Sequence, residues 1–479
     1  MKLIKDYELV CGLEVHVELA TSTKIFCSCP TTFGAEPNTQ CCPVCTGMPG
    51  ALPVLNRQVV DYAVMAGLAT NCRIAGYSKQ DRKNYFYPDL PKAYQISQYD
   101  LPLCEGGYLE IETEEGKKRI GITRIHIEED AGKLIHDVRY GTMIDCNRCG
   151  VPLIEIVSEP DIRSAEEAVA YVKKLRAVIM YTGVSDCRMN EGSLRCDVNL
   201  SVRKKGSEKF GTRTEMKNIN SFTFIREAIE YEYKRQVEIL EAGGAVVQET
   251  RRYDSETGET YSMRTKENAN DYRYFPDPDL PPVILTDKEV DALGKAIPRL
   301  PDERKAYYTE KYGLSEYDAE LLTENKRAAD YFESVAEATD YPKLAANMMI
   351  SELFALLPPD LDEVSIPIEP IHIAALATMA GEGTINSSVA KKLLRRIYET
   401  DSDPVKMVEQ EGLAQINDAV LLKKYVDEAV AADTKSVTAY KAGNTKAAKA
   451  IMGKVMAMTG GRGNPAVINE LLEAALLKL

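Results

Sequence analysis

Alternation of hydrophobic and polar residues is the main pattern in the first part of the chain. Within residues 7–19, hydrophobic side chains occupy every second position and polar ones lie between them. The segments 195–203 and 212–218 follow the same period of two. Because successive side chains of a strand point to opposite faces, this period predicts strands with one buried face and one polar face.

Between these segments, hydrophobic residues recur at helical spacing. One predicted helix covers 164–181 and begins with a capping box made by Ser164 and Glu167. Another covers 221–242 and stops at the glycine pair that follows. Strands and helices without strict alternation indicate an α+β domain built on an antiparallel sheet, which we place at residues 1–296.

The rest of the chain is rich in Ala, Leu, Lys and Glu and has almost no strand pattern. Prolines interrupt it at 358–359, within 367–370 and within 401–404. Since proline breaks a helix interior, these positions divide the stretch into separate helices. We expect an all-α middle domain at 297–402 and a small all-α C-terminal tail domain at 403–479.

Composition limits the class of protein. The 479 residues carry a net charge of −14, which argues against a generally basic surface that coats nucleic acid. No run approaches about 18 consecutive apolar residues, which a membrane-spanning helix needs. The first residues also lack the apolar core of a signal peptide. We therefore expect a cytoplasmic protein that does not enter a membrane.

The C-terminal segment reverses the overall charge. From Lys435 to Leu479, seven basic residues stand against two acidic ones, a local charge of +5. A basic segment of this kind can hold a polyanion such as RNA. A lysine-rich helix surface in contact with water would have the same composition. The charge alone leaves both interpretations open.

Cysteines cluster near the N-terminus. Five of the twelve lie within residues 27–45, where Cys27-Ser-Cys29 is followed by Cys42-Pro-Val-Cys45. Two close pairs can supply four thiolates to a tetrahedral Zn²⁺, and such a site is structural because no position is left for water. The alternative is a set of free thiols. Cys41 could replace Cys42, whereas the pair Cys146 and Cys149 has no second pair nearby in sequence and is not assigned to a metal.

Carboxylates recur on the polar faces of the predicted strands. They occur with one histidine and one lysine in four segments, at Glu14, His16 and Glu18, at Glu128, Glu129 and Asp130, at Asp197 and Asn199, and at Glu215 and Lys217. Such a set suits Mg²⁺ carrying nucleotide phosphates, because this ion prefers oxygen ligands. The alternative is the water-facing side of an antiparallel sheet. No GxxxxGK[ST] loop occurs, so a P-loop enzyme is excluded.

Aromatic and charged residues also gather around fixed prolines at 81–92, 94–100 and 271–280. Rigid loops of this composition are typical of the rim of a pocket. Seven long motifs of the chain then resemble one family, the GatB/GatE family, which provides the B subunit of the tRNA-dependent aspartyl/glutamyl amidotransferases. These motifs are GLEVHVEL (12–19), RKNYFYPDLPKAYQISQYD (82–100), RIHIEEDAGK (124–133), PLIEIVSEPDIRS (152–164), EGSLRCDVNLSVR (191–203), EMKNINSF (215–222) and DYRYFPDPDL (271–280).

The resemblance implies a glutamine-synthetase-like catalytic domain and a carbon–nitrogen ligase that uses glutamine as amide donor. In that reaction, ATP phosphorylates the side-chain carboxylate of Glu-tRNA(Gln) or Asp-tRNA(Asn), and ammonia then replaces the phosphate. The family's Mg²⁺ and ATP positions map onto Glu14, His16, Glu128, Glu129, Asp197 and Glu215. Lys83, Asn84 and Tyr85 would shape the substrate and ammonia end of the pocket. The catalytic set would be Glu14, His16, Lys83, Glu129 and Lys217.

The resemblance also implies partners. The family takes its ammonia from a separate amidase subunit, clamped by a small third subunit in a heterotrimer, and this chain has no Ser–Ser–Lys amidase segment of its own. The tail would bind tRNA through Lys441, Lys446, Lys449, Lys454 and Arg462, and the four cysteines lead us to expect zinc besides ATP and Mg²⁺. Two alternatives are a non-catalytic tRNA-binding scaffold and a free-standing ATP-dependent ligase acting on a small amino acid.

Overall fold

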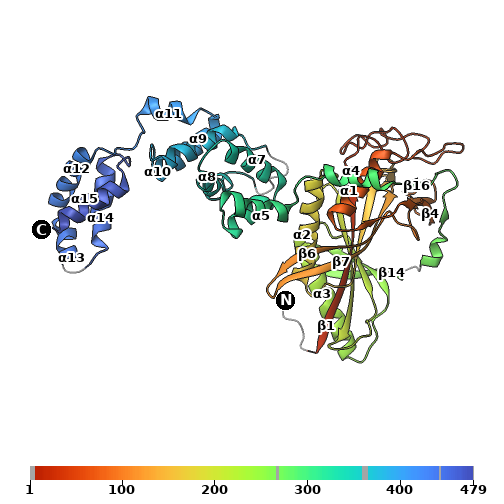
Figure 1. Ribbon diagram of the computed structural model, residues 1–479. Helices are drawn as coiled ribbons and strands as arrows, with labels where there is room; N and C mark the ends of the chain where they lie inside the picture. The colour runs from red at the N-terminus through yellow and green to blue at the C-terminus, as the bar shows by residue number, and fades with distance from the viewer. Residues whose placement is uncertain (1–5, 266–268, 359–364, 442–443, 478–479) are drawn as a thin grey trace. The chain divides into compact units, whose positions relative to one another are not determined.

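The computed structural model describes residues 6–265, 269–358, 365–441 and 444–477 (Figure 1). The chain divides into two compact units, Met1–Leu300 and Pro301–Leu479, each with its own hydrophobic core. This division lies close to the predicted boundary at residue 296. The predicted boundary at 402 stays a prediction.

A nine-stranded sheet forms the centre of the first unit. Its strands, in spatial order, are β14 (Glu259–Thr265), β13 (Glu249–Asp254), β12 (Thr214–Lys217), β11 (Leu194–Lys204), β1 (Tyr7–Glu18), β10 (Pro152–Ser158), β7 (Gly116–Glu129), β6 (Cys104–Thr113) and β2 (Arg73–Ile74). The predicted strand pattern in residues 7–19 is confirmed, because Leu13, Val15 and Val17 are buried while the polar residues between them are half-exposed.

The prediction of an antiparallel sheet is wrong at one pair of strands. Strands β12 and β13 run parallel, whereas every other neighbouring pair of this sheet is antiparallel. The reason is the connection between them, since the chain leaves β12, forms helix α3 (Phe222–Glu241) and returns to the sheet in the same direction. A crossover through a helix joins parallel strands, so the sheet is mixed.

Helices cover the hydrophobic face of the sheet. Residues of α1 (Arg57–Ala69), α2 (Ala165–Thr182) and α3 share one hydrophobic core with the inward side chains of the strands, and α2 and α3 lie against the sheet in Figure 1. The opposite face of the central strands is left for polar side chains.

Local signals explain where these helices begin and end. The Ser164 side chain accepts a hydrogen bond from the Glu167 N–H, as expected for an N-cap. The other half of the predicted capping box is absent, because the Glu167 carboxylate accepts from the Arg163 N–H instead. Helix α3 ends in a Schellman motif, with Gly243 in the left-handed region and the Gly244 N–H bonded to the Ile239 carbonyl.

Three small sheets and one short helix complete the first unit. A three-stranded sheet orders β15 (Phe275–Pro276), β4 (Asp81–Asn84) and β5 (Tyr94–Ser97), while β16 (Val283–Ile284) pairs with β3 (Tyr77–Ser78) and β8 (Lys133–Asp137) with β9 (Gly141–Asp145). A 3₁₀ turn covers Ala269–Tyr272, and α4 covers Asp287–Ala296. The β15–β4 pairing brings the predicted loops 81–92 and 271–280 together.

The second unit is helical throughout its described residues. Its helices are α5 (Pro301–Tyr312), α6 (Glu316–Thr323), α7 (Lys326–Glu337), α8 (Pro342–Met348) continued by a π-helical turn (Met349–Leu353), α9 (Pro370–Gly381), α10 (Ser387–Thr400), α11 (Pro404–Glu411), α12 (Ala419–Ala432), α13 (Thr434–Lys441), α14 (Ala447–Met458) and α15 (Pro465–Leu476). Residues up to Val408 form one hydrophobic cluster, and residues from Leu422 onwards form another. The predicted all-α character is confirmed.

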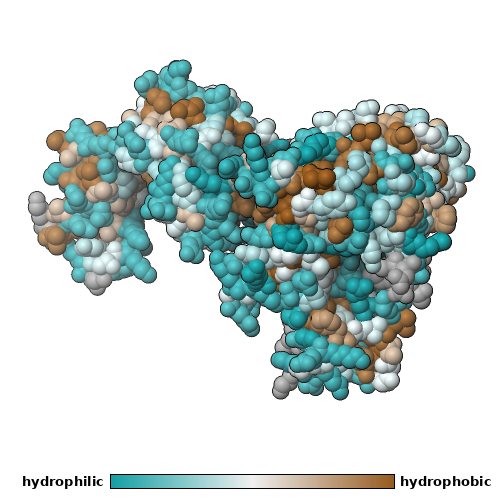
Figure 2. All heavy atoms as spheres, turned by 45° about the vertical axis from the view of Figure 1, so that its right-hand side comes forward, coloured by the Kyte–Doolittle hydropathy of each residue, from teal (hydrophilic) through white to brown (hydrophobic). Residues whose placement is uncertain are grey.

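The face of the molecule drawn in Figure 2 is mainly polar. Hydrophilic residues cover most of the face shown in Figure 2, and hydrophobic residues occur there in separate groups. Among the described residues, no helix is long and apolar enough to cross a membrane.

Candidate active site

The polar face of the central strands brings most of the predicted site residues together. Strand β1 lies between β11 and β10, and its register places Glu14 opposite Asp197 and His16 opposite Glu155. On the outer side of β11, Asn199 lies opposite Glu215 of β12. Directly opposed residues of antiparallel strands share a face, so side chains from four strands gather on one surface.

Two groups of possible metal ligands lie on this surface. In the first, His16, Glu128 and Glu155 each place a ligand atom within 4.8 Å of the other two, and in the second Glu14, Asp197 and Glu215 do the same. The His16 Nε2 lies 3.3 Å from Glu128 Oε1 and 3.6 Å from Glu155 Oε2.

The charges in the first group support one another. Burial disfavours a charged imidazole, yet hydrogen bonds to Glu128 and Glu155 raise the pKa of His16 to about 10. The same contacts have the opposite effect on the pKa values of the two carboxyl groups. Despite burial, which opposes ionisation, His126 and His16 hold the pKa of Glu128 and that of Glu155 well below their usual range. Both carboxylates are therefore ionised at neutral pH.

A lysine balances the second group. The Lys217 Nζ forms a close ion pair with Asp197 and lies 3.4 Å from Glu215 Oε1. Burial acts against its charge, but the two carboxylates raise the pKa of Lys217 above its usual value. The Glu14 Oε1 accepts a hydrogen bond of 3.0 Å from the Asn199 amide. The group therefore contains three acids, one cation and one amide donor.

A cavity of about 790 Å³ lies over this surface. Its floor includes Glu14, His16, Asp197, Glu215 and Lys217, and one of its walls comes from the two aromatic loops. Those loop residues are Lys83, Asn84, Tyr85, Phe86, Asp271, Tyr272, Arg273 and Tyr274. The predicted pocket rim is thus confirmed for loops 81–92 and 271–280.

Lys83 is one of two cations among the described residues of the loop wall, the other being Arg273. Its Nζ lies 4.9 Å from the centre of the Tyr272 ring and 5.7 Å from that of Tyr85. Although burial opposes the charge, Tyr274 and Glu128 raise the pKa of Lys83 above its usual value. Lys83 therefore carries its positive charge into the cavity.

The neighbours of Lys83 hold the loops in place. The Asn84 amide donates to the backbone carbonyls of Tyr272 and Arg273, at 3.3 and 2.8 Å. The Tyr85 hydroxyl donates to Gln95 Oε1 at 3.1 Å. Asn84 thus ties one aromatic loop to the other, and Tyr85 ties the first loop to β5.

Glu129 does not lie with the other predicted ligands. Glu128 and Glu129 are consecutive in β7, so their side chains point to opposite faces. The Glu129 carboxylate accepts from the Ile96 N–H at 2.8 Å and forms a close ion pair with Lys92. It lines a second cavity of about 130 Å³, together with Cys27 and other residues. The sequence analysis grouped Glu129 with the Mg²⁺ ligands. The alternation of side chains along β7 instead points Glu129 to the opposite face.

Two site residues escaped the sequence reasoning. Glu155 belongs to the first group of ligands, and His126 places its Nε2 3.2 Å from Glu155 Oε2. His126 is buried, and its Nδ1 has no hydrogen-bond partner among the described residues. The alternation of residues 124–128 and 152–158 was a usable signal, because it puts His126 with Glu128 on one face and Glu155 on a polar position of the next strand.

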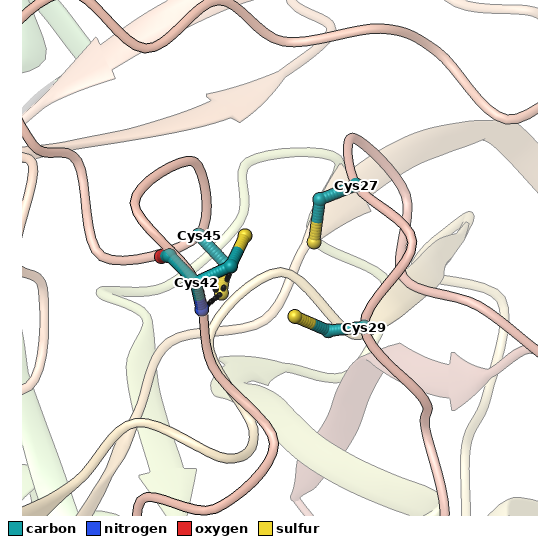
Figure 3. Close-up of side chains that lie close together, drawn as sticks. All are labelled: Cys27, Cys29, Cys42 and Cys45. Carbon is teal, nitrogen blue, oxygen red and sulfur yellow. Dashed lines mark hydrogen bonds between the residues drawn. The ribbon is translucent and has the colours of Figure 1, made fainter.

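The four predicted zinc ligands do come together. Cys27 and Cys29 on one loop point toward Cys42 and Cys45 on the other (Figure 3), and the four Sγ atoms lie within 4.8 Å of one another. The Cys42 N–H donates to the Cys45 Sγ at 3.1 Å. The neighbouring pair Cys146 and Cys149 lies next to this cluster, since the Cys146 carbonyl contacts Lys24, which also contacts the Cys45 Sγ.

The basic residues predicted to bind tRNA differ in their surroundings. Lys446 and Lys449 are exposed near the start of α14, and Lys441 is exposed at the end of α13. Lys454 forms an ion pair of 2.9 Å with Asp433. Arg462 donates to the Gly412 carbonyl. The last two residues therefore already have partners within the chain.

Comparison with known proteins gives full-length matches. The family model described as the GatB/GatE catalytic domain matches residues 9–291, and the one described as the GatB domain matches residues 330–476. The B subunit of the aspartyl/glutamyl-tRNA(Asn/Gln) amidotransferase of Caldicellulosiruptor saccharolyticus is 57% identical over 99% of this chain and 100% of its own length.

The proteins of the same name from Caldicellulosiruptor bescii and Carboxydothermus hydrogenoformans are 56% and 53% identical, again over 99% of this chain and the whole of theirs. The family resemblance of the sequence motifs is thereby confirmed. The chain belongs to the GatB/GatE family, as a homologue of the B subunit of aspartyl/glutamyl-tRNA(Asn/Gln) amidotransferase.

Proposed function

We propose that this chain is the subunit of a tRNA-dependent amidotransferase that activates and amidates the side-chain carboxylate of Glu-tRNA(Gln), Asp-tRNA(Asn) or both. The observation that carries the proposal is the cavity over the sheet, because its floor holds two groups of acidic ligands and its rim holds fixed cations. A site for a nucleoside triphosphate needs acidic ligands for its metal ion and cations for its phosphates.

The residues fit Mg²⁺ as the metal. Oxygen ligands of one Mg²⁺ lie at most about 4.2 Å apart, given bonds of about 2.1 Å. Each group already holds its ligand atoms within 4.8 Å of one another, so a small inward movement of the side chains is sufficient. We propose that Glu14, Asp197 and Glu215 hold one ion and that Glu128 and Glu155, with His16 after release of its proton, hold another. Bound Mg²⁺ neutralises charge on the transferring phosphoryl group.

The reaction has two steps. The substrate carboxylate oxygen attacks the γ-phosphorus of ATP, and the bond to the bridging oxygen of the β-phosphate breaks, so that ADP leaves. Ammonia then attacks the acyl carbon, phosphate leaves with its bonding electrons, and one proton is released to give the amide. We propose that Lys83 and Lys217 orient phosphate oxygens by charge, while Asn84 and Tyr85 hold the loop that carries Lys83.

Ammonia and tRNA come from outside this chain. We propose that a partner amidase supplies the ammonia and that a small third protein completes the heterotrimer. The tail residues Lys441, Lys446, Lys449 and Lys454 are exposed cations of the predicted tRNA surface, and Lys454 also pairs with Asp433. Phosphate contacts from such residues give affinity that falls with salt concentration.

We further propose that the four cysteines hold a structural Zn²⁺. Four thiolates at about 2.3 Å from a tetrahedral ion lie about 3.8 Å apart, and the Cys42 and Cys45 Sγ atoms lie 3.9 Å apart. With four sulfur ligands, the ion would fix the two loops and leave no position for a reacting water.

A pair of adjacent substitutions tests the catalytic proposal. In the reconstituted heterotrimer with mischarged tRNA, we expect Glu128→Gln to reduce phosphate release from ATP at least 100-fold, because it removes a charged ligand. Glu129→Gln is the matched control, and it should keep phosphate release within a few-fold because its side chain lies on the other side of the strand. Thermal unfolding of both variants checks their folding.

The outcomes separate the alternatives. Unchanged phosphate release in Glu128→Gln would support a non-catalytic scaffold, in which the acidic face is structural. Amide formation by the chain without tRNA and without partner subunits would support a free-standing ligase. Loss of phosphate release in both variants would contradict the assignment of the two carboxylates to opposite faces of β7.

A further inference from the structure

We propose that Lys24 is the internal counter-charge of the four-cysteine centre, a positioning residue that favours the metal-loaded form. The inference rests on the zinc site proposed above. It concerns a residue that none of the sequence motifs singles out.

The Lys24 side chain is fully buried, with 0% relative exposure. Its ammonium group contacts the Gln40 carbonyl at 2.7 Å, the Cys146 carbonyl at 3.3 Å and the Cys45 Sγ at 3.6 Å. An ammonium has three N–H donors, so these three acceptors use all of them. One of the three is a proposed metal ligand.

No described carboxylate forms an ion pair with Lys24, although other buried cations of the first unit have acidic partners, as Arg251 has Glu232 and Glu249. Burying a charge without an opposite charge is costly, and carbonyl dipoles do not cancel it. Of the three groups that the ammonium contacts, the Cys45 thiol is the one that can carry a negative charge.

A bound metal ion with its thiolates would provide the negative charge that Lys24 otherwise lacks. Zn²⁺ with four thiolates has a net charge of −2, and Lys24 and Cys45 lie on its buried side, whereas Cys27, Cys29 and Cys42 are partly exposed. A cation in contact with one sulfur lowers the energy of that charge, and it donates to the sulfur as outer-shell groups commonly do at metal sites. With protonated thiols, the same ammonium would remain without compensation.

The position of Lys24 is fixed by the backbone before any metal binds. Its N–H donates to the Cys29 carbonyl at 2.9 Å, and the next residue, Ile25, donates to the Gly150 carbonyl at 2.9 Å. Lys24 therefore joins the loop of the first cysteine pair, the loop that ends at Cys45 and the loop that begins at Cys146. The charge is placed without further ordering of the side chain.

The test compares metal affinity in the full-length chain. Lys24→Met removes the charge and keeps the length, Lys24→Arg keeps the charge, and Lys133→Met removes an exposed lysine as the control. Zinc affinity is measured by competition with a chromogenic chelator, and the thiolate-to-metal absorption of the Co²⁺-loaded protein reports the ligand set. Thermal unfolding is followed for the metal-free and the zinc-loaded forms.

We expect Lys24→Met to weaken zinc binding about 10- to 100-fold, as loss of outer-shell partners does at other metal sites. Lys24→Arg should recover most of the affinity, and the control should match the unchanged chain. The metal-free form of Lys24→Met should be no less stable than the metal-free unchanged chain, since it no longer buries an uncompensated charge.

Two results would overturn the inference. Zinc affinity of Lys24→Met within two-fold of the unchanged chain, with equal loss of stability in both forms, would make Lys24 a purely structural link between loops. An unchanged chain that binds neither Zn²⁺ nor Co²⁺ would remove the metal proposal itself, and Lys24 with it. The first result leaves the zinc site intact, so the two failures are distinguishable.

Discussion

Replacing Glu232 by alanine is expected to destabilise the first unit strongly. Glu232 lies on α3 and is fully buried. Its carboxylate accepts from Arg235 at 2.7 and 2.8 Å and lies 3.3 Å from the Arg251 Nε. Hydroxyls of Thr214 and Thr260 also donate to it, at 2.9 and 3.1 Å. One side chain therefore joins α3 to strands β12, β13 and β14.

The size of the effect follows from what the truncation leaves behind. Removing one partner of a buried ion pair costs about 3–5 kcal/mol, because a charge remains without compensation. Both guanidinium groups keep a contact with Glu249, so we expect the lower end, about 3 kcal/mol. For a unit of this size, that corresponds to a fall in unfolding temperature of roughly 5–10 °C.

The assay is thermal and urea unfolding of the full chain, followed by circular dichroism. Glu238→Ala on the same helix is the control, since its ion pair with Lys234 is exposed and contributes little. A loss below 1 kcal/mol in Glu232→Ala would refute the reasoning. It would mean that water or rearranged side chains compensate the two arginines.

The Glu232 carboxylate also leads to a prediction about how stability depends on pH. Burial alone would raise the pKa of Glu232, but hydrogen bonds from Arg235 and Gln236 hold it below its usual value. A group with a lowered pKa in the folded state contributes stability above its unfolded value of about 4.3 and loses it as the pH falls further. The stability difference between the unchanged chain and Glu232→Ala should therefore shrink below pH 4.

Four further predictions concern other parts of the molecule. Elemental analysis should find about one zinc per chain, lost in Cys42→Ser, and an equally stable zinc-free chain would contradict the metal site. Replacing Lys446 and Lys449 together by alanine, or ending the chain after residue 402, should weaken tRNA binding and reduce its salt dependence, whereas unchanged binding at every salt concentration would make the basic tail irrelevant to tRNA. Gly453→Ala should stabilise the C-terminal cluster by about 0.4–1 kcal/mol, because a Cβ there meets open space within α14; a lower unfolding temperature would contradict this. Gly107→Ala should cost about 1–3 kcal/mol, because its Cβ would meet the Cys72 Sγ and the Thr70 carbonyl, and a neutral result would show that both can move away.

Local patterns were enough to predict several individual elements. The period of two in residues 7–19 predicted β1, and Ser164 and the pair at 243–244 marked helix ends, because both signals act between neighbours in the sequence. The parallel pairing of β12 and β13 was missed. It depends on where the chain returns to the sheet after α3, which no local pattern records.

The candidate site, like the fold, could be predicted only in part from the sequence. Glu14 and Asp197 were predicted together through the family resemblance, whereas Glu155 was missed, since its place beside His16 depends on the pairing of two strands far apart in sequence. The separation of Glu129 from the other predicted ligands could have been seen in the sequence, because adjacent strand residues point to opposite faces, and its catalytic role stays a prediction. The likeness to glutamine synthetase stays a prediction.

Strand β7 places the carboxylate of Glu128 against His16, which lines the first cavity, and that of Glu129 in the second cavity. Consequently, this strand is sensitive to a change of length as well as to changes of side chain. A single residue inserted between Ile122 and Glu128 would exchange the two faces, bringing Ile127 to the place of Glu128 beside His16 and a charge to the hydrophobic face. The number of residues in this strand matters as much as their chemistry. It keeps one carboxylate beside His16 and the other in the cavity that Cys27 lines.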